Sequence, residues 1–173
     1  MEKVILVDKD DVEIGEMEKM EAHQKGELHR AFSIFIFNEN DELMLQQRAF
    51  SKYHSGGLWT NTCCSHPRKG ESTIEAAHRR LKEEMGFDCE LKEIFTFTYN
   101  ADVGQGLIEH EYDHVFIGKY NKVVEINTEE VEDYKFKKLS ELTMDVLMSP
   151  NDFTKWFIIA FGKMIEYLNS NPL

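Results

Sequence analysis

The stretch that decides the interpretation of this chain is WTNTCCSHPRKGESTIEAAHRRLKEEMGF, residues 59–87. Cys64 and His66 stand just before a proline, and the pattern Ser72-x-x-Glu75 is a capping box that predicts the start of a helix. A thiol, an imidazole and a helix rich in carboxylates, this close together, are seldom needed for structure alone. We therefore expect the chemistry of the protein to lie here.

Composition restricts the class of protein. The chain has 173 residues, is 42% hydrophobic and contains 12 phenylalanines, which predicts one globular domain over residues 1–173. Its net charge of −12 argues against nonspecific binding to nucleic acid or anionic membranes. No run of 18 apolar residues is present, so no membrane span is expected. Three cysteines leave at least one free thiol, and an acidic start gives no secretory signal, so we expect a cytoplasmic, monomeric protein.

Hydrophobic periodicity predicts a mixed α/β fold. A hairpin is expected from strands at 29–38 and 42–48, and a glycine-containing loop at 100–110. Further strands are expected at 4–7, 13–14, 89–99, 111–120 and 131–136. Helices are expected from about residue 73 to Gly86 and over 152–168, with a lightly helical segment at 16–22 and a loop at 49–58.

One stripe of the first long helix carries a carboxylate. Ala77, Arg80, Leu81 and Glu84 are spaced i, i+3, i+4 and i+7, and the two apolar members mark the stripe as inward-facing. A buried carboxylate needs a cation. An ion pair with Arg80 and a Mg²⁺ ion at Glu84 are equally good interpretations of this spacing.

Three histidines and two glutamates form a second candidate set. Any one of His23, His29 and His66 is by itself more simply explained as a surface or hydrogen-bonded side chain. Glu109 and Glu111 are two residues apart, so on a strand both carboxylates face one side and call for a metal ion or a shared proton. If these segments converge, three histidines with two glutamates suit Zn²⁺ or Mn²⁺.

The cysteines divide into inert and presented side chains. Cys63 and Cys64 are adjacent, so on an extended chain one packs inside and the other faces a pocket. Cys89 lies in an apolar segment and is expected to be packed. His66 either lowers the pKa of a neighbouring thiol or belongs to a metal site.

Cations and aromatic residues surround the expected pocket in sequence. Lys19, Arg48, Lys52 and Lys69 are either ordinary solvated side chains or the positive lining that a diphosphate requires. Tyr99 and Trp156 are candidate aromatic walls. Core packing is the default explanation of Trp156, and a π-face turned toward a cation is the alternative.

Residues 65–87 resemble the Nudix signature, a loop–helix–loop that binds a metal–diphosphate group. The match reads Ser65-x5-Glu71-x7-Arg79-Arg80-Leu81-Lys82-Glu83-Glu84-Met85-Gly86-Phe87. Ser65 stands in place of a glycine, and Arg80 replaces the first glutamate of the Arg-Glu pair. That glutamate usually binds metal or activates water, so its absence argues against hydrolysis. The resemblance implies an α/β fold in which a mixed β-sheet is sandwiched between helices.

Over nearly the whole chain, further motifs resemble the type 1 isopentenyl-diphosphate Δ-isomerase family. They are HRAFSIFIFN at 29–38, QQRAFSK at 46–52, the Trp-Thr-Asn-x-x-Cys-x-His-Pro block at 59–67, Glu109-x-Glu111 and the late Trp156. The block at 59–67 is the most specific, since ordinary Nudix hydrolases lack it.

The resemblance implies a role for each matching residue. A catalytic thiol maps to Cys64, a catalytic glutamate to Glu111, and a tyrosine beside that glutamate to Tyr99. The metal ligands map to His23, His29, His66, Glu109 and Glu111, with Mn²⁺ or Zn²⁺ as the ion, and Glu84 maps to a Mg²⁺ ligand that engages the diphosphate. The substrate-side cations map to Lys19, Arg48 and Lys52.

The implied chemistry agrees with these residue types. Moving a double bond from a terminal to an internal position requires a proton added to one carbon and removed from another, and two groups on opposite faces of an alkene can do this. A tertiary carbocation forms between the two steps, and the face of Trp156 is suited to stabilise it. The expected substrate is an isoprenoid diphosphate, and no flavin or nucleotide cofactor is required.

Two other functions compete with isomerisation. The first is a Nudix hydrolase that cleaves a nucleoside or isoprenoid diphosphate, which would not depend on Cys64. The second is a regulatory domain that binds metal and diphosphate without turnover. The joint presence of Cys64, Glu111 and all five candidate ligands favours the isomerase.

Overall fold

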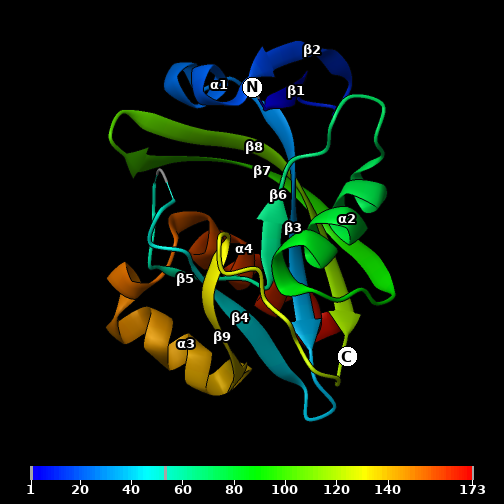
Figure 1. Ribbon diagram of the computed structural model, residues 1–173, viewed down its shortest axis with the longest axis vertical. Coiled ribbons are helices and arrows are strands. Elements are labelled where there is room, and N and C mark those ends of the chain that lie inside the picture. Colours follow the sequence, from blue (N-terminus) through cyan, green and yellow to red (C-terminus); the bar gives the residue numbers. More distant parts are fainter. Residues whose placement is uncertain (1, 53, 173) are drawn as a thin grey trace.

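The computed structural model describes residues 2–52 and 54–172 (Figure 1). The strands are β1 Lys3–Val7, β2 Glu13–Glu18, β3 His29–Phe37, β4 Glu42–Arg48, β5 Trp59–Thr60, β6 Cys63–Ser65, β7 Leu91–Gly104, β8 Leu107–Lys119 and β9 Val131–Lys138. The helices are α1 Lys19–Lys25, α2 Thr73–Met85, α3 Leu139–Met148, the 3₁₀ turn η1 Pro150–Asp152 and α4 Lys155–Ser170. The predicted α/β class, a mixed sheet between helices, is confirmed.

Strand β3 is the centre of the sheet. It pairs in parallel with β8 along its whole length, while β1, β6 and β4 share its opposite edge in turn. A strand with neighbours on both edges and helices over both faces is expected to be largely apolar, and β3, HRAFSIFIF, is apolar at six of its nine positions. Figure 1 shows α2 on one side of this strand and α4 on the other.

Two hydrophobic cores hold the helices against the sheet. Alternation along β3 directs Phe32, Ile34 and Ile36 toward α2, where Leu81 and Met85 meet them. The intervening Phe35 and Phe37 belong to the second core, which includes Trp156, Phe157 and Phe161 of α4. Each large side chain buried in this way contributes roughly 1.5–3 kcal/mol, so the two cores fix both helices firmly.

The predicted hairpin is correct only at its tip. β3 and β4 pair at two positions, Ile36 with Met44 and Phe37 with Leu43, and then separate. β6 takes the edge of β3 beyond this point, and β5 takes the edge of β4. This separation of β3 from β4 matters because the functional pocket is lined both by residues of β4 and by residues of β6, which pairs with β3.

The predicted loop at 100–110 is wrong. Strands β7 and β8 continue through this segment as one long antiparallel hairpin, and the turn is confined to Gln105 and Gly106. Gly104 and Gly106 misled the prediction, since both have positive φ but serve only the turn. The strand therefore reaches Glu109 and Glu111 and places both carboxylates on one face.

The remaining expectations differ mainly at element ends. The segment at 16–22 splits between β2 and α1, the strand expected from residue 89 begins at Leu91, and the C-terminal helix begins at Lys155 after η1. Helix α3 was not predicted. Helix α2 matches its prediction, because Ser72 and Glu75 make both hydrogen bonds of the capping box and Gly86 ends the helix.

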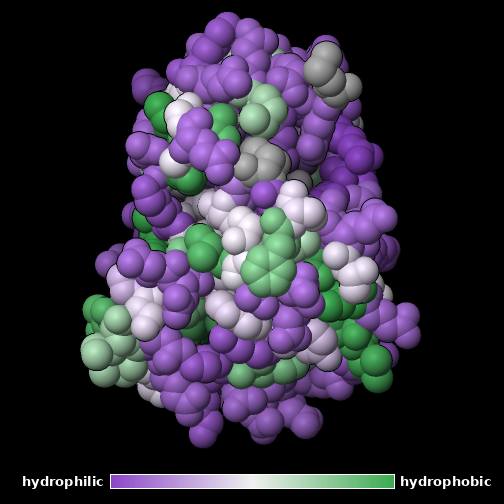
Figure 2. Space-filling view, turned by 60° about the vertical axis from the view of Figure 1, so that its left-hand side comes forward, coloured by the Kyte–Doolittle hydropathy of each residue, from purple (hydrophilic) through white to green (hydrophobic). Residues whose placement is uncertain are grey.

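The surface agrees with the acidic composition. In the face shown in Figure 2, hydrophilic residues predominate and hydrophobic ones gather in small patches. Among the described residues, the exposed large apolar side chains include Leu147 and Met148 of α3. Within the same residues, the helices are too short or too polar to cross a membrane.

The end of α2 generates a prediction for Gly86→Ala. Gly86 has φ +73°, and a Cβ atom there would lie 2.2 Å from the carbonyl oxygen of Glu125. We expect the variant to lose about 3 kcal/mol of unfolding free energy in urea denaturation. The loss comes from backbone strain at residue 86 and from displacement of the backbone at Glu125. Gly70→Ala is the matched control, because Gly70 has φ +78° and open space around its Cβ position. Equal losses in the two variants would contradict the contact argument.

Candidate active site

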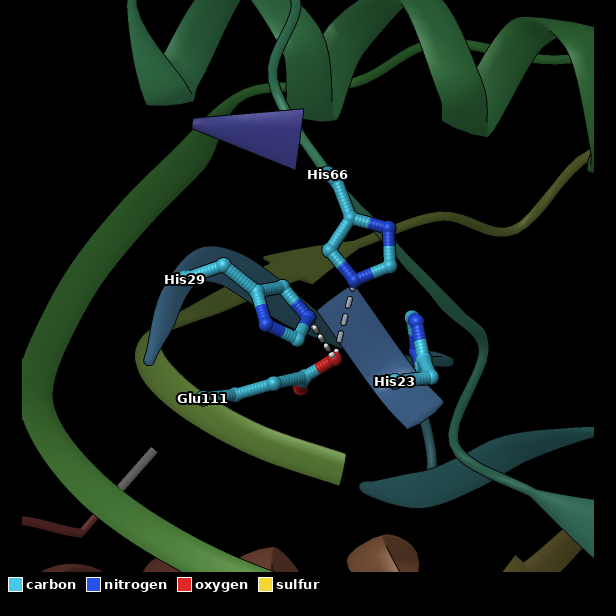
Figure 3. A group of neighbouring side chains, drawn as sticks. All are labelled: His23, His29, His66 and Glu111. Atoms are coloured by element: carbon cyan, nitrogen blue, oxygen red, sulfur yellow. Dashed lines mark hydrogen bonds and ion pairs between the residues drawn. The ribbon is translucent and has the colours of Figure 1, made fainter. Parts of the chain in front are cut away.

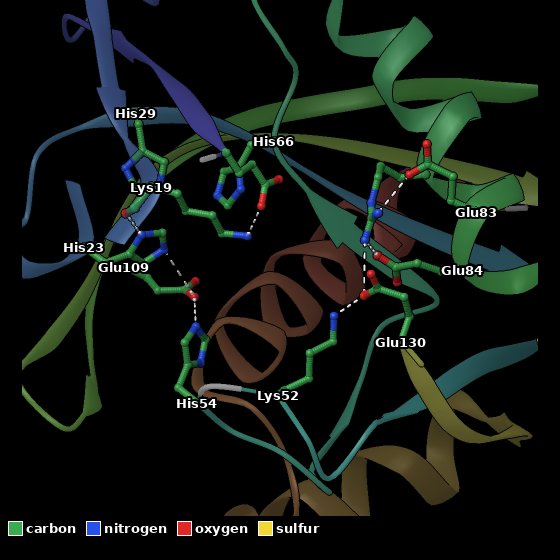
Figure 4. A network of polar contacts seen from close by, with 12 residues as sticks. Lys19, His23, His29, Lys52, His54, His66, Glu83, Glu84, Glu109 and Glu130 are labelled. Carbon is green, nitrogen blue, oxygen red and sulfur yellow. Dashed lines mark hydrogen bonds and ion pairs between the residues drawn. The ribbon is translucent and has the colours of Figure 1, made fainter. Parts of the chain in front are cut away.

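The structure gathers most of the candidate residues around one pocket. The pocket is lined by Lys19, Gln46, Arg48, Lys52, His54, Cys64, Ser65, His66, Arg80, Glu84, Glu109, Glu111, Glu130 and Trp156. His23, His29 and Tyr99 contact its carboxylates from behind. Lys69 does not belong to it, because its side chain is exposed and pairs with Glu16 at 3.1 Å. Figure 4 shows the polar network that runs across the pocket.

Two carboxylates share one tyrosine. The Tyr99 hydroxyl lies 2.6 Å from Oε2 of Glu111 and 3.0 Å from Oε2 of Glu109, and it carries one proton to donate. Burial, reinforced by the charge of Glu111, raises the pKa of Glu109 to about 8. Burial alone would raise the pKa of Glu111 too, but interactions with His29 and His66 hold it well below its usual value. Glu111 is therefore the ionised member of the pair.

Three histidines surround the free oxygen of Glu111 (Figure 3). Its Oε1 lies 2.9 Å from Nε2 of His66 and 3.6 Å from Nε2 of His29. One ligand atom from each of His23, His29, His66 and Glu111 lies within 4.8 Å of the others. The outer nitrogens Nδ1 of His23 and His29 bond to the backbone carbonyls of Lys19 and Glu27, at 2.6 and 2.8 Å.

This cluster fits a divalent metal ion. Burial lowers the pKa of His23 and lowers that of His66 to about 4, so the rings are neutral and able to ligate. Among the described residues, the buried Nε2 atoms of His23 and His29 have no hydrogen-bond partner. Outer nitrogens fixed by backbone carbonyls are the usual support of ligating histidines. The donor set combines nitrogen and carboxylate oxygen, which suits a transition metal.

The adjacent cysteines face opposite ways. Cys63 is fully buried against the core under α2, and Cys64 is half-buried and lines the pocket. Burial raises the pKa of the Cys64 thiol far above its usual value, although the nearby Arg48 acts in the other direction. Cys64 therefore presents a protonated thiol.

An aromatic and a cationic side chain, Trp156 and Arg48, also line the pocket. Trp156 is 3% exposed, packs in the core under α4 and still reaches the pocket. The guanidinium carbon of Arg48 lies 5.1 Å from the centre of its ring. Trp156 therefore packs in the core and also has the guanidinium of Arg48 over its ring.

The other end of the pocket is built around Glu84. Its carboxylate accepts hydrogen bonds from Arg80 and, at 2.8 Å, from Nε2 of Gln46. Arg80 also lies 3.4 Å from Glu130, which in turn pairs with Lys52 (Figure 4). The intrahelical pair of Arg80 with Glu84 is thus present, and Lys52 faces the pocket beside it.

Sequence reasoning missed three residues of the pocket. Gln46 and Glu130 sit at the Glu84 end, and His54 sits at the histidine end with Nε2 3.3 Å from Oε1 of Glu109. Gln46 gave no distinct signal, because it is followed by two further polar residues, Gln47 and Arg48, at the end of β4. His54 and Glu130 lie in loops without a recognisable spacing motif.

Comparison with known families places this architecture. The NUDIX domain model matches residues 27–157. Among solved structures, the DR0079 protein of Deinococcus radiodurans superposes with a TM-score of 0.71 at 15% identity, covering 86% of this chain and 90% of that one. The MutT protein of Methanosarcina mazei superposes with a TM-score of 0.65 at 18% identity, covering 84% and 96%. Fold and site therefore define a Nudix-domain protein with a buried histidine–glutamate centre.

Curated relatives narrow the class. A protein of Pectobacterium atrosepticum named isopentenyl-diphosphate Delta-isomerase is 53% identical, over 95% of this chain and 92% of its own length. The isopentenyl-diphosphate Delta-isomerase 2 of Aromatoleum aromaticum is 51% identical, over 98% and 90%. This chain belongs to the isopentenyl-diphosphate Delta-isomerase family.

The shared tyrosine generates a prediction for Glu109→Gln, which removes a charge but keeps an acceptor for Tyr99. The pKa of Glu109 is about 8 in the folded protein and near 4.5 ordinarily, so the folded state binds this proton more tightly. The wild type must then lose stability relative to the variant as pH rises from about 4.5 through 8. We expect the gap in unfolding free energy between the metal-free proteins to widen by on the order of 4 kcal/mol between about pH 5 and pH 8.5.

Urea denaturation after chelation measures this gap. Asn100→Ala serves as a control on the neighbouring strand β7, because Asn100 is exposed and carries no charge. A gap that stays constant with pH would show that Glu109 is ionised in the folded metal-free protein at every pH tested.

Proposed function

We propose that this protein interconverts isopentenyl diphosphate and dimethylallyl diphosphate, with Cys64 and Glu111 as the two acid–base groups. The observation that carries the proposal is a pocket that combines a protonated thiol with an ionised, tyrosine-bound carboxylate. Isomerisation requires one group that gives a proton and one that takes it. About half of the residues are shared with curated relatives named for this activity.

The sheet directs both groups into the pocket from opposite edges of β3. Cys64 on β6 is opposite Ser33, and Glu111 on β8 is opposite His29. Ser33 and His29 are four residues apart on one strand, so they face the same side of the sheet. A flat alkene between the two edges would meet the thiol on one face and the carboxylate on the other.

The protonation states suit the two roles. Burial keeps the Cys64 thiol protonated, so it can donate to one carbon of the alkene. Glu111 is ionised and held by Tyr99, so it can accept a proton from the other carbon. Each forward turnover leaves Cys64 as a thiolate and Glu111 protonated, so a proton must return from Glu111 to Cys64, directly or through solvent, before the next forward turnover. In the reverse direction each group performs the opposite step.

The surroundings favour a carbocation between the two proton transfers. Trp156 offers an aromatic surface in the pocket, and a π-face attracts a cation most strongly where water is excluded. The core under α4 supplies the apolar packing behind this ring. Water would otherwise capture the cation as an alcohol, so closure of this wall protects the reaction.

The substrate's diphosphate is assigned to the Glu84 end of the pocket. Lys52 lies at this end, and Lys19 and Arg48 line the same pocket, so the three cations would offset the negative charge of both protein and substrate. Glu84 would hold Mg²⁺ together with diphosphate oxygens, an arrangement that Mg²⁺ commonly adopts. This requires Arg80 to share Glu84, and Glu130 is placed to receive the displaced guanidinium.

The histidine cluster is assigned to Mn²⁺ or Zn²⁺, with His23, His29, His66, Glu109 and Glu111 as ligands. Such an ion supplies positive charge that offsets the two adjacent carboxylates and lowers the pKa of both. No flavin or nucleotide is needed, since the reaction transfers only protons.

Incorporation of deuterium from solvent into the product, followed by NMR, tests the proposal. Incubation of the metal-loaded protein with isopentenyl diphosphate in D₂O should yield deuterated dimethylallyl diphosphate. Cys64→Ala and Glu111→Gln should each lower kcat by at least about 100-fold, because each removes a proton-transfer group. Cys89→Ala is the matched control and should keep its activity, since Cys89 packs on the α2 side of the sheet and does not line the pocket.

Other products would contradict the assignment. Release of phosphate or of a monophosphate would indicate the hydrolase alternative, and full activity in Cys64→Ala would remove the thiol from the mechanism. An unchanged substrate in the presence of bound metal would leave a binding domain.

A further inference from the structure

His54 is built like the ligating histidines, although the expected ligand set does not include it. Its side chain is 3% exposed. The inner nitrogen, Nε2, lies 3.3 Å from Oε1 of Glu109, and the outer nitrogen, Nδ1, lies 3.2 Å from the hydroxyl of Ser55. His23 and His29 show the same construction, with the outer nitrogen engaged by a protein oxygen and the inner nitrogen turned toward a carboxylate.

A second group of candidate donors adjoins the first. Ligand atoms of His23, His54 and Glu109 all lie within 4.8 Å of one another, and all three side chains are buried. The free nitrogen of His23 is common to both groups, since its Nδ1 bonds to the carbonyl of Lys19. One nitrogen lone pair binds one ion, so an ion bound at His23 would take its remaining ligands from one of these groups or from both.

The ring positions support a single centre. The centroid of His23 lies 5.0 Å from that of His29, 5.9 Å from that of His66 and 6.2 Å from that of His54. Four rings are thus arranged at similar spacing, with His23 central. On the other side, His54 packs edge-on against Trp156 at 5.7 Å, and Arg48 donates a hydrogen bond to its backbone carbonyl at 3.3 Å. These contacts hold the ring in place.

We propose that His54 is a further ligand of the divalent metal centre, binding through Nε2 on the side of Glu109. The inference rests on the proposed metal site at the histidine cluster and extends its donor set to four histidines and two glutamates. The simpler alternative is that His54 only donates a hydrogen bond to Glu109.

The assignment has a consequence for the substrate end. His54 lies two residues after Lys52, which faces the pocket beside Glu84 and Glu130. A metal bond to His54 would fix the backbone that presents Lys52. The metal ion would then hold Lys52, a cation of the proposed diphosphate site, in position without contacting the substrate.

Direct observation of metal–nitrogen bonds decides between ligation and hydrogen bonding. The protein labelled with [¹⁵N]histidine and loaded with ¹¹³Cd²⁺ should show ¹¹³Cd–¹⁵N scalar coupling at Nε2 of His23, His29, His54 and His66. His78, His110 and His114 are internal controls, because they bond to Asp88, to the Gly26 carbonyl and to Asp11 and lie outside both donor groups. His54→Gln assigns the resonance of interest by its disappearance.

Each outcome bears on a different claim. Coupling at His54 establishes the proposal. Coupling at the other three rings without His54 overturns it and leaves the metal centre intact. Absence of coupling at every histidine removes the centre itself, and the proposal with it.

Metal affinity gives a second measurement on variants. We expect His54→Gln to weaken Mn²⁺ binding at least about 10-fold and His78→Gln to leave it unchanged, both measured from the free-ion electron paramagnetic resonance signal. Equal affinity in His54→Gln and wild type would overturn the proposal. Weaker binding without cadmium coupling at His54 would also overturn it, in favour of the hydrogen bond to Glu109.

Discussion

The structure depends on two carboxylates buried side by side. Glu109 and Glu111 point the same way from one strand, and desolvated like charges repel strongly. The site offsets this repulsion with neutral histidines, the shared hydroxyl of Tyr99 and the cations at its mouth. The result is an unequal pair, in which Glu111 is ionised and Glu109 readily holds a proton. Any ion or substrate that binds here has to complete this balance of charge.

The fold meets that constraint by bringing distant segments to one strand. β3 supplies His29 and separates the thiol on β6 from the glutamates on β8. Helix α1 adds His23, while α4 closes the apolar wall with Trp156. The separation of β4 from β3 leaves room between strands for Gln46 and Glu84 to meet. Continuous pairing of β3 with β4 would have closed the gap between the two strands with backbone hydrogen bonds.

Sequence predicted what depends on local chemistry. The capping box and stripe of α2 were sufficient because both act within a few residues, and the alternation of Cys63 and Cys64 needed only an extended backbone. The glycines at 104 and 106 look the same in a loop and in a tight turn, so the long hairpin was missed. His54 escaped notice because a histidine in a loop acquires its neighbours only through tertiary folding. The convergence of the other candidate ligands was expected from the family resemblance, and the structure supplied its geometry.

The burial that keeps the Cys64 thiol protonated also determines its reactivity. Electrophiles and peroxides react with a thiolate, and a thiol whose pKa is raised forms very little of it near neutral pH. The side chain lines an open pocket, yet its chemistry is that of a sheltered residue. Under the proposed function, the cysteine that meets the substrate would stay slow to oxidise, and the same desolvation that keeps its proton would protect the protein from oxidative inactivation.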